Sequence, residues 1–361
     1  MKKTIIAASV AALVAAPAAF ADVKIGGNVI QEFVSDSDET GNKEDGLESK
    51  AAVDLVFSVS EDLGNGLSAF AKIHTLRDNG GSGNADQVVG LKGDFGTVVV
   101  GRMEDFSEGK VAAMAATDSS DALSIEPNGT YNTGRNEGGI AYVSPSFNGV
   151  TFGVAGYALP NMGTTNSVVT IASQTGLYVS GNTSVGVSSS NATRLTYANS
   201  SSKDADANID ATDIMIEYAN AGLTVRLAQE NVDGKVYGAN KEDQKTTSIG
   251  ASYKMGDMTL VGYHFDVDNG KGVSTNDADG WFLGAKVAMG ANTFGIGYSE
   301  ETDTHTTTSA VETTGDDKNY MISVDHALSK RTSITAAFEA NEDGTAGADN
   351  DKWAIGLKHV F

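Results

Sequence analysis

Apolar and polar residues alternate with a period of two along most of the chain. A clear stretch lies at 53–59, where the first face carries Val53, Leu55, Phe57 and Val59 and the second carries Asp54, Val56 and Ser58. Side chains of a β-strand point alternately to opposite faces, so this period predicts strands with one apolar face. Helical periodicity is nowhere comparably strong. We therefore expect an all-β fold.

Sixteen segments carry this alternation. They are 23–34, 47–59, 66–77, 86–93, 97–103, 138–145, 149–158, 211–218, 222–230, 245–254, 257–266, 279–288, 292–300, 318–326, 331–339 and 351–361. Between them, 159–210 is rich in Ser, Thr and Asn. This segment is either one long external loop or hides another hairpin, which would make eighteen strands. We expect sixteen.

The connections alternate strictly between long acidic loops and short turns. The long ones include 35–46, 78–85, 104–137, 231–244, 267–278, 301–317 and 340–350, and the short ones lie near 94–96, 146–148, 219–221, 255–257, 289–291 and 327–330. Long loops at one end and short turns at the other are typical of outer-membrane barrels. Only a closed sheet satisfies every backbone group in lipid, and sixteen strands leave room for an aqueous channel. The pattern predicts a transmembrane antiparallel β-barrel.

The first residues predict export. Lys2 and Lys3 precede an apolar run at 5–16, and Ala19-Phe20-Ala21 is a small-x-small cleavage pattern. These are the parts of a signal peptide, which we expect to span 1–21 and to leave 22–361 as a single barrel domain. No later stretch reaches the roughly 18 apolar residues of a spanning helix. We expect location in the outer membrane of a Gram-negative bacterium.

Composition excludes several classes of function. The net charge is −22, or −24 without Lys2 and Lys3, which argues against nucleic acid as a partner. The five histidines form no motif for nucleophilic catalysis, so an enzyme is not expected. Calcium could bind at acidic loops, but counted from Asp266 the EF-hand spacing fails, because Gly270 falls at position five and Asp277 at position twelve. Solvated loops without a cofactor are the preferred interpretation.

Three segments carry a family resemblance. At the C-terminus Trp353, Ile355, Leu357, His359 and Phe361 alternate with other residues, and the chain ends on the aromatic ring. This terminal strand resembles that of the general diffusion porins of Gram-negative bacteria. Residues 135–149 resemble the strand–turn–strand that follows the constriction loop in that family, and 99–102 resemble the strand that enters the loop.

The resemblance implies partners and an assembly route. Members of this family are trimers in a bilayer of lipid and lipopolysaccharide, and they pass small hydrophilic solutes. Their final strand is the signal read by the barrel-assembly machinery, which implies that role for 353–361 here. The family also folds one long loop into the barrel to narrow it, and that loop corresponds to 104–137.

The candidate constriction combines acids of this loop with bases of the wall. The acids are Glu104, Asp105, Glu108, Asp118 and Asp121, and the bases on the inward parity are Lys50, Lys72 and Arg102. Opposed fixed charges would set a transverse field that discriminates ions. The alternative is that the acids solvate an external loop while the bases line the lumen. The Ala-rich stretch 111–116 lacks the Pro-Glu-Phe-Gly-Gly tip of enteric members.

The negative net charge predicts a weakly cation-selective channel, because acidic loops around the mouth concentrate cations. Two other functions remain open at this point. A substrate-specific sugar channel usually has an aromatic ladder along the lumen, but aromatics on the inward parity are few here (Phe70, Tyr157 and Phe282). A secreted acidic β-rich surface protein would share the composition but not the one-sided loop lengths.

Overall fold

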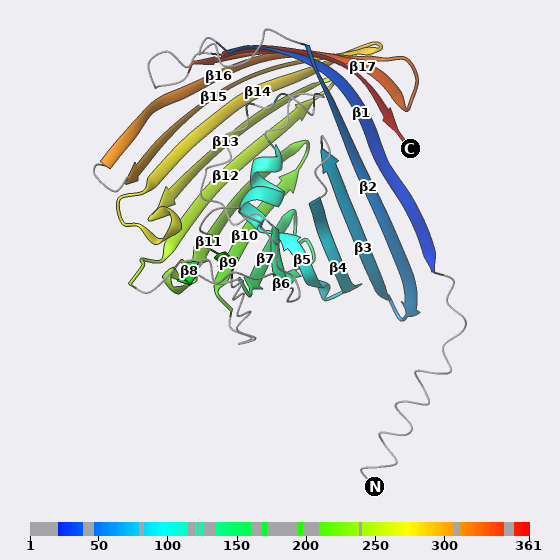
Figure 1. The fold of residues 1–361 in the computed structure, drawn as a ribbon. Helices are drawn as coiled ribbons and strands as arrows, with labels where there is room; N and C mark the ends of the chain where they lie inside the picture. Colours follow the sequence, from blue (N-terminus) through cyan, green and yellow to red (C-terminus); the bar gives the residue numbers. More distant parts are fainter. Residues whose placement is uncertain are drawn as a thin grey trace.

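A computed structural model gives the fold (Figure 1). It describes residues 21–38, 47–78, 83–114, 120, 123, 125, 135–159, 168–171, 194–197, 209–237, 240–306, 311–342 and 350–361. The expected signal peptide lies outside these residues apart from Ala21.

Sixteen strands form one closed antiparallel barrel. They are β1 (Asp22–Asp38), β2 (Leu47–Gly64), β3 (Leu67–Asp78), β4 (Gly83–Gly93), β5 (Gly96–Glu104), β6 (Arg135–Val143), β7 (Val150–Tyr157), β10 (Ala211–Asn220), β11 (Leu223–Val232), β12 (Gln244–Met255), β13 (Met258–Asp268), β14 (Asp277–Met289), β15 (Asn292–Thr306), β16 (Val311–Ala327), β17 (Thr332–Glu342) and β18 (Asn350–Val360). The barrel closes where β18 pairs with β1. The sixteen-strand expectation is confirmed, and each predicted segment overlaps one barrel strand.

The segment 159–210 contains a hairpin that does not join the barrel. Strands β8 (Val168–Ile171) and β9 (Arg194–Tyr197) pair only with each other. In the barrel β7 pairs directly with β10, with Tyr157 opposite Ala211. Because that ladder is already complete, the extra hairpin adds no strand to the wall.

The alternation separates the two faces of the wall. On β1 the outward side chains of Val29 and Phe33 are exposed, whereas Ile30, Glu32 and Val34 are buried on the inside. Outward aromatic rings gather near both ends of the barrel. Near the long connections, the ring centroids of Trp281 and Tyr298 lie 4.9 Å apart and those of Tyr298 and Tyr320 lie 4.8 Å apart; near the short turns the rings are Tyr218, Tyr253 and Phe294. Such aromatic girdles mark the two membrane interfaces.

Several strands are longer than the sequence pattern predicts. The expected loop 301–317 is wrong, because β15 and β16 stay paired as far as Thr306 opposite Val311. The expected loop at 35–46 also begins too early, since β1 continues to Asp38. Beyond the lipid, an outward side chain need not be apolar, so the hydrophobic alternation stops while backbone pairing continues.

Helical segments are short. Over the described ranges they are η1 (Ser107–Val111), η2 (Ala112–Met114), η3 (Gly234–Val236) and η4 (Gly270–Gly272). In the part of the chain that the structure describes, no helix has the length and apolar character needed to span a membrane.

Candidate pore constriction

The chain turns into the barrel directly after β5. The coils of η1 and η2 lie inside the ring of strands (Figure 1), and three contacts fasten this part of the loop to the wall. The backbone N–H of Phe106 donates to the carboxylate of Asp213 on β10. The hydroxyls of Ser107 and Ser248 are 2.8 Å apart. The expected folding of a long loop into the lumen is therefore confirmed.

A third contact comes from β11. There the Nη1 of Arg226 donates to the carbonyl oxygen of Lys110 at 2.7 Å. The fastened loop thus spans the inner faces of β10, β11 and β12.

Two glycines in the wall make room for the loop. A Cβ on Gly250 would lie 3.0 Å from Cγ1 of Val111 and 3.1 Å from the sulfur of Met114. A Cβ on Gly153 would lie 2.9 Å from the ring of Phe106. Larger residues at these positions would push the loop away from the wall.

The loop also covers apolar side chains of the inner wall. Val111, Leu123 and Ile125 from the loop belong to one buried cluster with Tyr263, Phe265 and Phe282 from β13 and β14. All six are at most 7% exposed. Removing this apolar surface from water stabilises the inserted position of the loop.

Gly250→Val is expected to displace the loop. Forcing a β-branched side chain into this contact typically costs about 1–3 kcal/mol. The substitution destabilises the inserted position of the loop and not the strand, because neighbouring strands hold the ladder backbone in place. We expect increased current noise or higher conductance in single-channel recordings, with the folded barrel retained. Gly26→Val is the matched control, since the nearest atom to its Cβ, the backbone oxygen of Phe361, is 3.7 Å away. Identical recordings for both variants would contradict this packing.

Charged side chains on β3 to β6 form one network, here called the wall network. The Nζ of Lys72 lies 2.8 Å from Oδ2 of Asp86. The Nε of Arg135 lies 3.7 Å from Oδ1 of Asp86, and the guanidinium also pairs with the carboxylate of Glu104. Acid and base therefore alternate along the same wall.

This network corrects the expected position of Glu104. Glu104 is the last residue of β5 and pairs with the neighbouring strand, so it belongs to the wall and does not face the bases from the loop. The chain leaves the sheet only at Asp105, which is 1% exposed and close enough to Asp213 to interact with it electrostatically. Lys50 lies opposite the buried Glu32 in the ladder of β1 and β2.

The alternation that placed Arg102 on the inward parity is interrupted in β5. Val100, two residues earlier, is 40% exposed on the outside, so strict alternation would turn Arg102 outward. Gly101 between them has φ of +133°, and the ladder register shifts between Gly101 and Met103. The alternation of β5 therefore does not support an inward direction for the Arg102 side chain. Its expected place at the constriction follows from the family resemblance. Asp118, Asp121 and the side chain of Glu108 lie outside the described residues.

Sequence reasoning missed Asp86, Arg135, Asp213 and Arg226 as members of the site. Asp213 carries a visible signal, because it stands on the inward parity of β10 between the buried Ala211 and Met215. Its partner Phe106 is 107 residues away along the chain. Neither local spacing nor periodicity connects residues so far apart.

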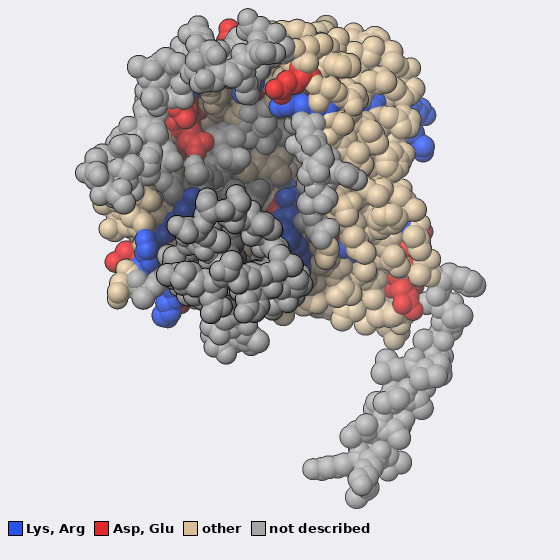
Figure 2. Space-filling view, in the orientation of Figure 1, with Lys and Arg blue, Asp and Glu red and all other residues tan. Residues whose placement is uncertain are grey.

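The space enclosed by the wall is lined by charge. Figure 2 shows the molecule hollowed, with Lys and Arg side chains on the sides of the hollow. Over the ranges that the structure describes, no group of three or more His, Asp or Glu residues is placed to hold a metal ion. Asp268, expected in the loop 267–278, belongs with Asp266 to strand β13.

Comparisons with known proteins agree with this architecture. A sequence model of the Gram-negative porin family matches residues 7–346, and no curated protein matches the chain. Among solved structures, an anion-selective porin from Comamonas acidovorans is 18% identical with a TM-score of 0.62, over 95% of this chain and 100% of that chain.

Two further solved structures share the fold. OmpF of Salmonella typhi is 15% identical with a TM-score of 0.66, over 94% of this chain and 97% of that one. OmpT of Vibrio cholerae is 12% identical with a TM-score of 0.62, over 94% and 99%. The family match spans nearly the whole sequence and the closed barrel accords with it, so the chain belongs to the Gram-negative porins, the diffusion channels of the outer membrane.

Proposed function

We propose that the protein is a general diffusion porin that passes ions and small hydrophilic solutes with a weak preference for cations. The observation that carries this proposal is the closed sixteen-strand barrel whose interior is narrowed by a fastened loop. A barrel of this size encloses water rather than a packed core of side chains. Charges at the narrowest part then bias which ions pass.

The rim of long connections supports a preference for cations. With the strand ends that adjoin them, these connections carry many carboxylates, including Asp243, Asp268, Asp277 and Glu342. At one point of this rim the backbone N–H of Lys235 donates to Asp233 at 2.9 Å and its ammonium lies 3.1 Å away. These contacts hold the pKa of the Asp233 carboxyl below its usual range. The paired ammonium balances the charge of this carboxylate, so the negative potential of the rim comes from its other carboxylates. Negative potential around the mouth concentrates cations.

A sugar-specific channel is the weaker alternative. Such a channel needs aromatic faces exposed along the path of the solute. The inward aromatic rings Tyr263, Phe265 and Phe282 are instead buried under the loop. The interior therefore offers these rings no exposed stacking surface, and a general channel fits better.

The route to the membrane and the partners form part of the proposal. We expect cleavage after Ala21, recognition of the final strand by the barrel-assembly machinery, and a surround of lipid and lipopolysaccharide. The solved OmpT structure is described as a trimer form, which supports a homotrimer here. We expect no cofactor, because conduction through such a pore requires no bond chemistry.

Reversal potentials in a salt gradient test the selectivity. At low salt we expect a modest cation preference, which fades as the Debye length falls from about 10 Å at 0.1 M to about 3 Å at 1 M. Arg102→Ala should increase the preference, because it removes a positive charge from the expected constriction. Preference for anions at low salt would contradict the proposed role of the rim.

Arg331→Ala is the matched control. Arg331 is exposed in the short turn between β16 and β17, at the end of the barrel opposite the long connections. The same charge is removed, so a pure net-charge effect would shift both variants equally. A shift confined to Arg102→Ala would place that residue at the constriction.

A further inference from the structure

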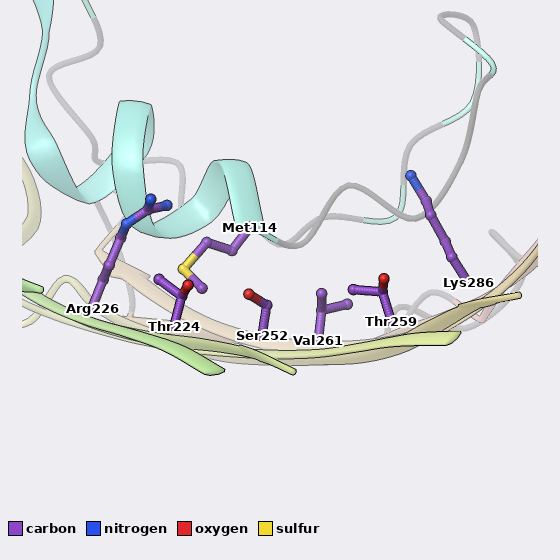
Figure 3. Close-up of a pocket in the computed structure, with 7 residues that line it drawn as sticks. All are labelled: Met114, Thr224, Arg226, Ser252, Thr259, Val261 and Lys286. Carbon is purple, nitrogen blue, oxygen red and sulfur yellow. The ribbon is translucent and has the colours of Figure 1, made fainter. Parts of the chain in front are cut away.

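A second polar site lies on the inner wall beside the inserted loop. Its volume is about 280 Å³. Seven residues line it: Met114 from the loop, and Thr224, Arg226, Ser252, Thr259, Val261 and Lys286 from β11 to β14 (Figure 3). We call this the hydroxyl pocket.

The floor of the hydroxyl pocket is set by strand register. Thr224 lies opposite Ser252 in the ladder of β11 and β12. One strand further, Thr259 lies opposite Lys286 in the ladder of β13 and β14. Directly opposed residues share a face with Cβ atoms about 4.5–5.5 Å apart. Between these two pairs, Ser252 lies opposite Val261 in the ladder of β12 and β13. The lining residues therefore form a short row that faces the lumen and is polar except for Val261, which lies between Ser252 and Thr259 (Figure 3).

Two cationic side chains stand at the ends of this row. Figure 3 shows Arg226 at one end and Lys286 at the other, both projecting from the sheet toward the side on which Met114 lies. The Nε of Arg226 binds Oε2 of Glu217 at 2.6 Å, and its Nη1 binds the carbonyl of Lys110 at 2.7 Å. These two contacts hold the guanidinium at the edge of the pocket.

The lining itself carries no carboxylate, although Glu217 just outside it neutralises part of the charge of Arg226. The polar side chains of the lining are an arginine, a lysine and three hydroxyls. Arginine and lysine only donate hydrogen bonds, and a hydroxyl can turn to donate. Charge-assisted donation to an anionic oxygen gives the strongest of these bonds. The complementary solute is a small anion with several acceptor oxygens.

We propose that the hydroxyl pocket is a binding subsite for small oxyanions, carboxylate or phosphate, on the permeation path. The inference rests on the proposed function, since a solute reaches the pocket only through an open channel. Rim carboxylates govern which ions approach the mouth, whereas the pocket acts on anions already inside. A cation-preferring channel would thereby hold an oxyanion briefly against the wall.

The test uses the full-length porin in planar bilayers. Inorganic phosphate is added to potassium chloride at constant ionic strength and pH, and the current is recorded. We expect a saturable fall in current. Lys286→Gln should raise the half-blocking phosphate concentration about tenfold, as for the loss of one charge-assisted hydrogen bond. A fall that is linear in phosphate would overturn the proposal.

Lys358→Gln is the charge-matched control. Lys358 is half-buried on β18, opposite the buried Ile30, and is not part of the pocket. Its removal should leave the half-blocking concentration within about twofold of the parent, because it alters only the distant field. Equal shifts for the two lysine variants would overturn the proposal.

A double variant separates binding from charge. Ser252→Ala with Thr259→Val keeps both cations and removes two donors. Phosphate block should weaken while the reversal potential in potassium chloride stays unchanged.

Acetate in place of phosphate then identifies the oxyanion: saturable block by acetate assigns a carboxylate site, and block by phosphate alone assigns a phosphate site. An unchanged block by either anion in the double variant would overturn the subsite. Absence of any conductance of the unmodified porin in potassium chloride would overturn the proposed function itself.

Discussion

Removal of residues 108–130, with a short Gly-Ser link in their place, is expected to raise single-channel conductance by about a factor of two or more, because conductance grows with the open cross-section of a pore. The deleted stretch contains most of η1, all of η2 and the buried Leu123 and Ile125. Of the residues of this stretch that the structure describes, none takes part in a ladder pair of the barrel. The barrel should therefore still close and migrate as a heat-modifiable band.

A matched deletion controls for loop removal as such. In the connection between β13 and β14, the backbone N of Gly270 lies 2.5 Å from the carbonyl oxygen of Asn276. Removing 271–275 shortens an external loop whose ends already meet. Conductance should stay at the parental value. A rise in both deletions, or in neither, would contradict the role of the inserted loop as the constriction.

Deletion of Phe361 is expected to lower the amount of assembled barrel in the outer membrane severalfold while export continues. The backbone of Phe361 extends the closing seam beyond β18: its N–H donates to the oxygen of Gly27 at 3.0 Å, and its oxygen accepts from the N–H of Gly27 at 3.3 Å. Losing two hydrogen bonds costs about 2 kcal/mol, and the final aromatic of the expected assembly signal is lost as well. Semi-native gel electrophoresis of outer-membrane fractions measures the result.

Two comparisons separate recognition from stability. Phe147→Ala removes another exposed aromatic ring at a short turn but leaves the seam intact, so its assembly should be normal. Refolding of the Phe361 deletion from urea into detergent bypasses the assembly machinery. Normal refolding with poor assembly in cells would support a signal role. Normal assembly in cells would refute the prediction.

The positions of the barrel strands could be predicted from the sequence because they depend on local patterns. Alternation of side chains is a property of each strand by itself, and short turns are marked by Asn and Gly, as at Asn65-Gly66 and Asn148-Gly149, where φ is positive. The strand ends could not be predicted equally well. Past the lipid, the apolar signal disappears while the hydrogen-bonded ladder continues, as it does in β15 and β16.

The constriction depended on contacts that no local pattern contains. The acids and bases could be named from the sequence, but Glu104 pairs with Arg135 in the neighbouring strand and Arg226 holds a loop carbonyl 116 residues away. At Arg102 a single bulge around Gly101 breaks the parity on which its direction was inferred.

The sequence by itself determined the class of fold and the one-sided distribution of loops, because a chain with this alternation can satisfy every backbone group in lipid only as a closed sheet. The structure decided between sixteen and eighteen strands, because β7 pairs directly with β10 and the hairpin of β8 and β9 stays outside the barrel. Tertiary structure alone decided where the loop rests, which charges meet and where the hydroxyl pocket forms. Those outcomes depend on curvature, register and the space left by Gly153 and Gly250. They arise only when strands distant in the sequence face one another across the lumen.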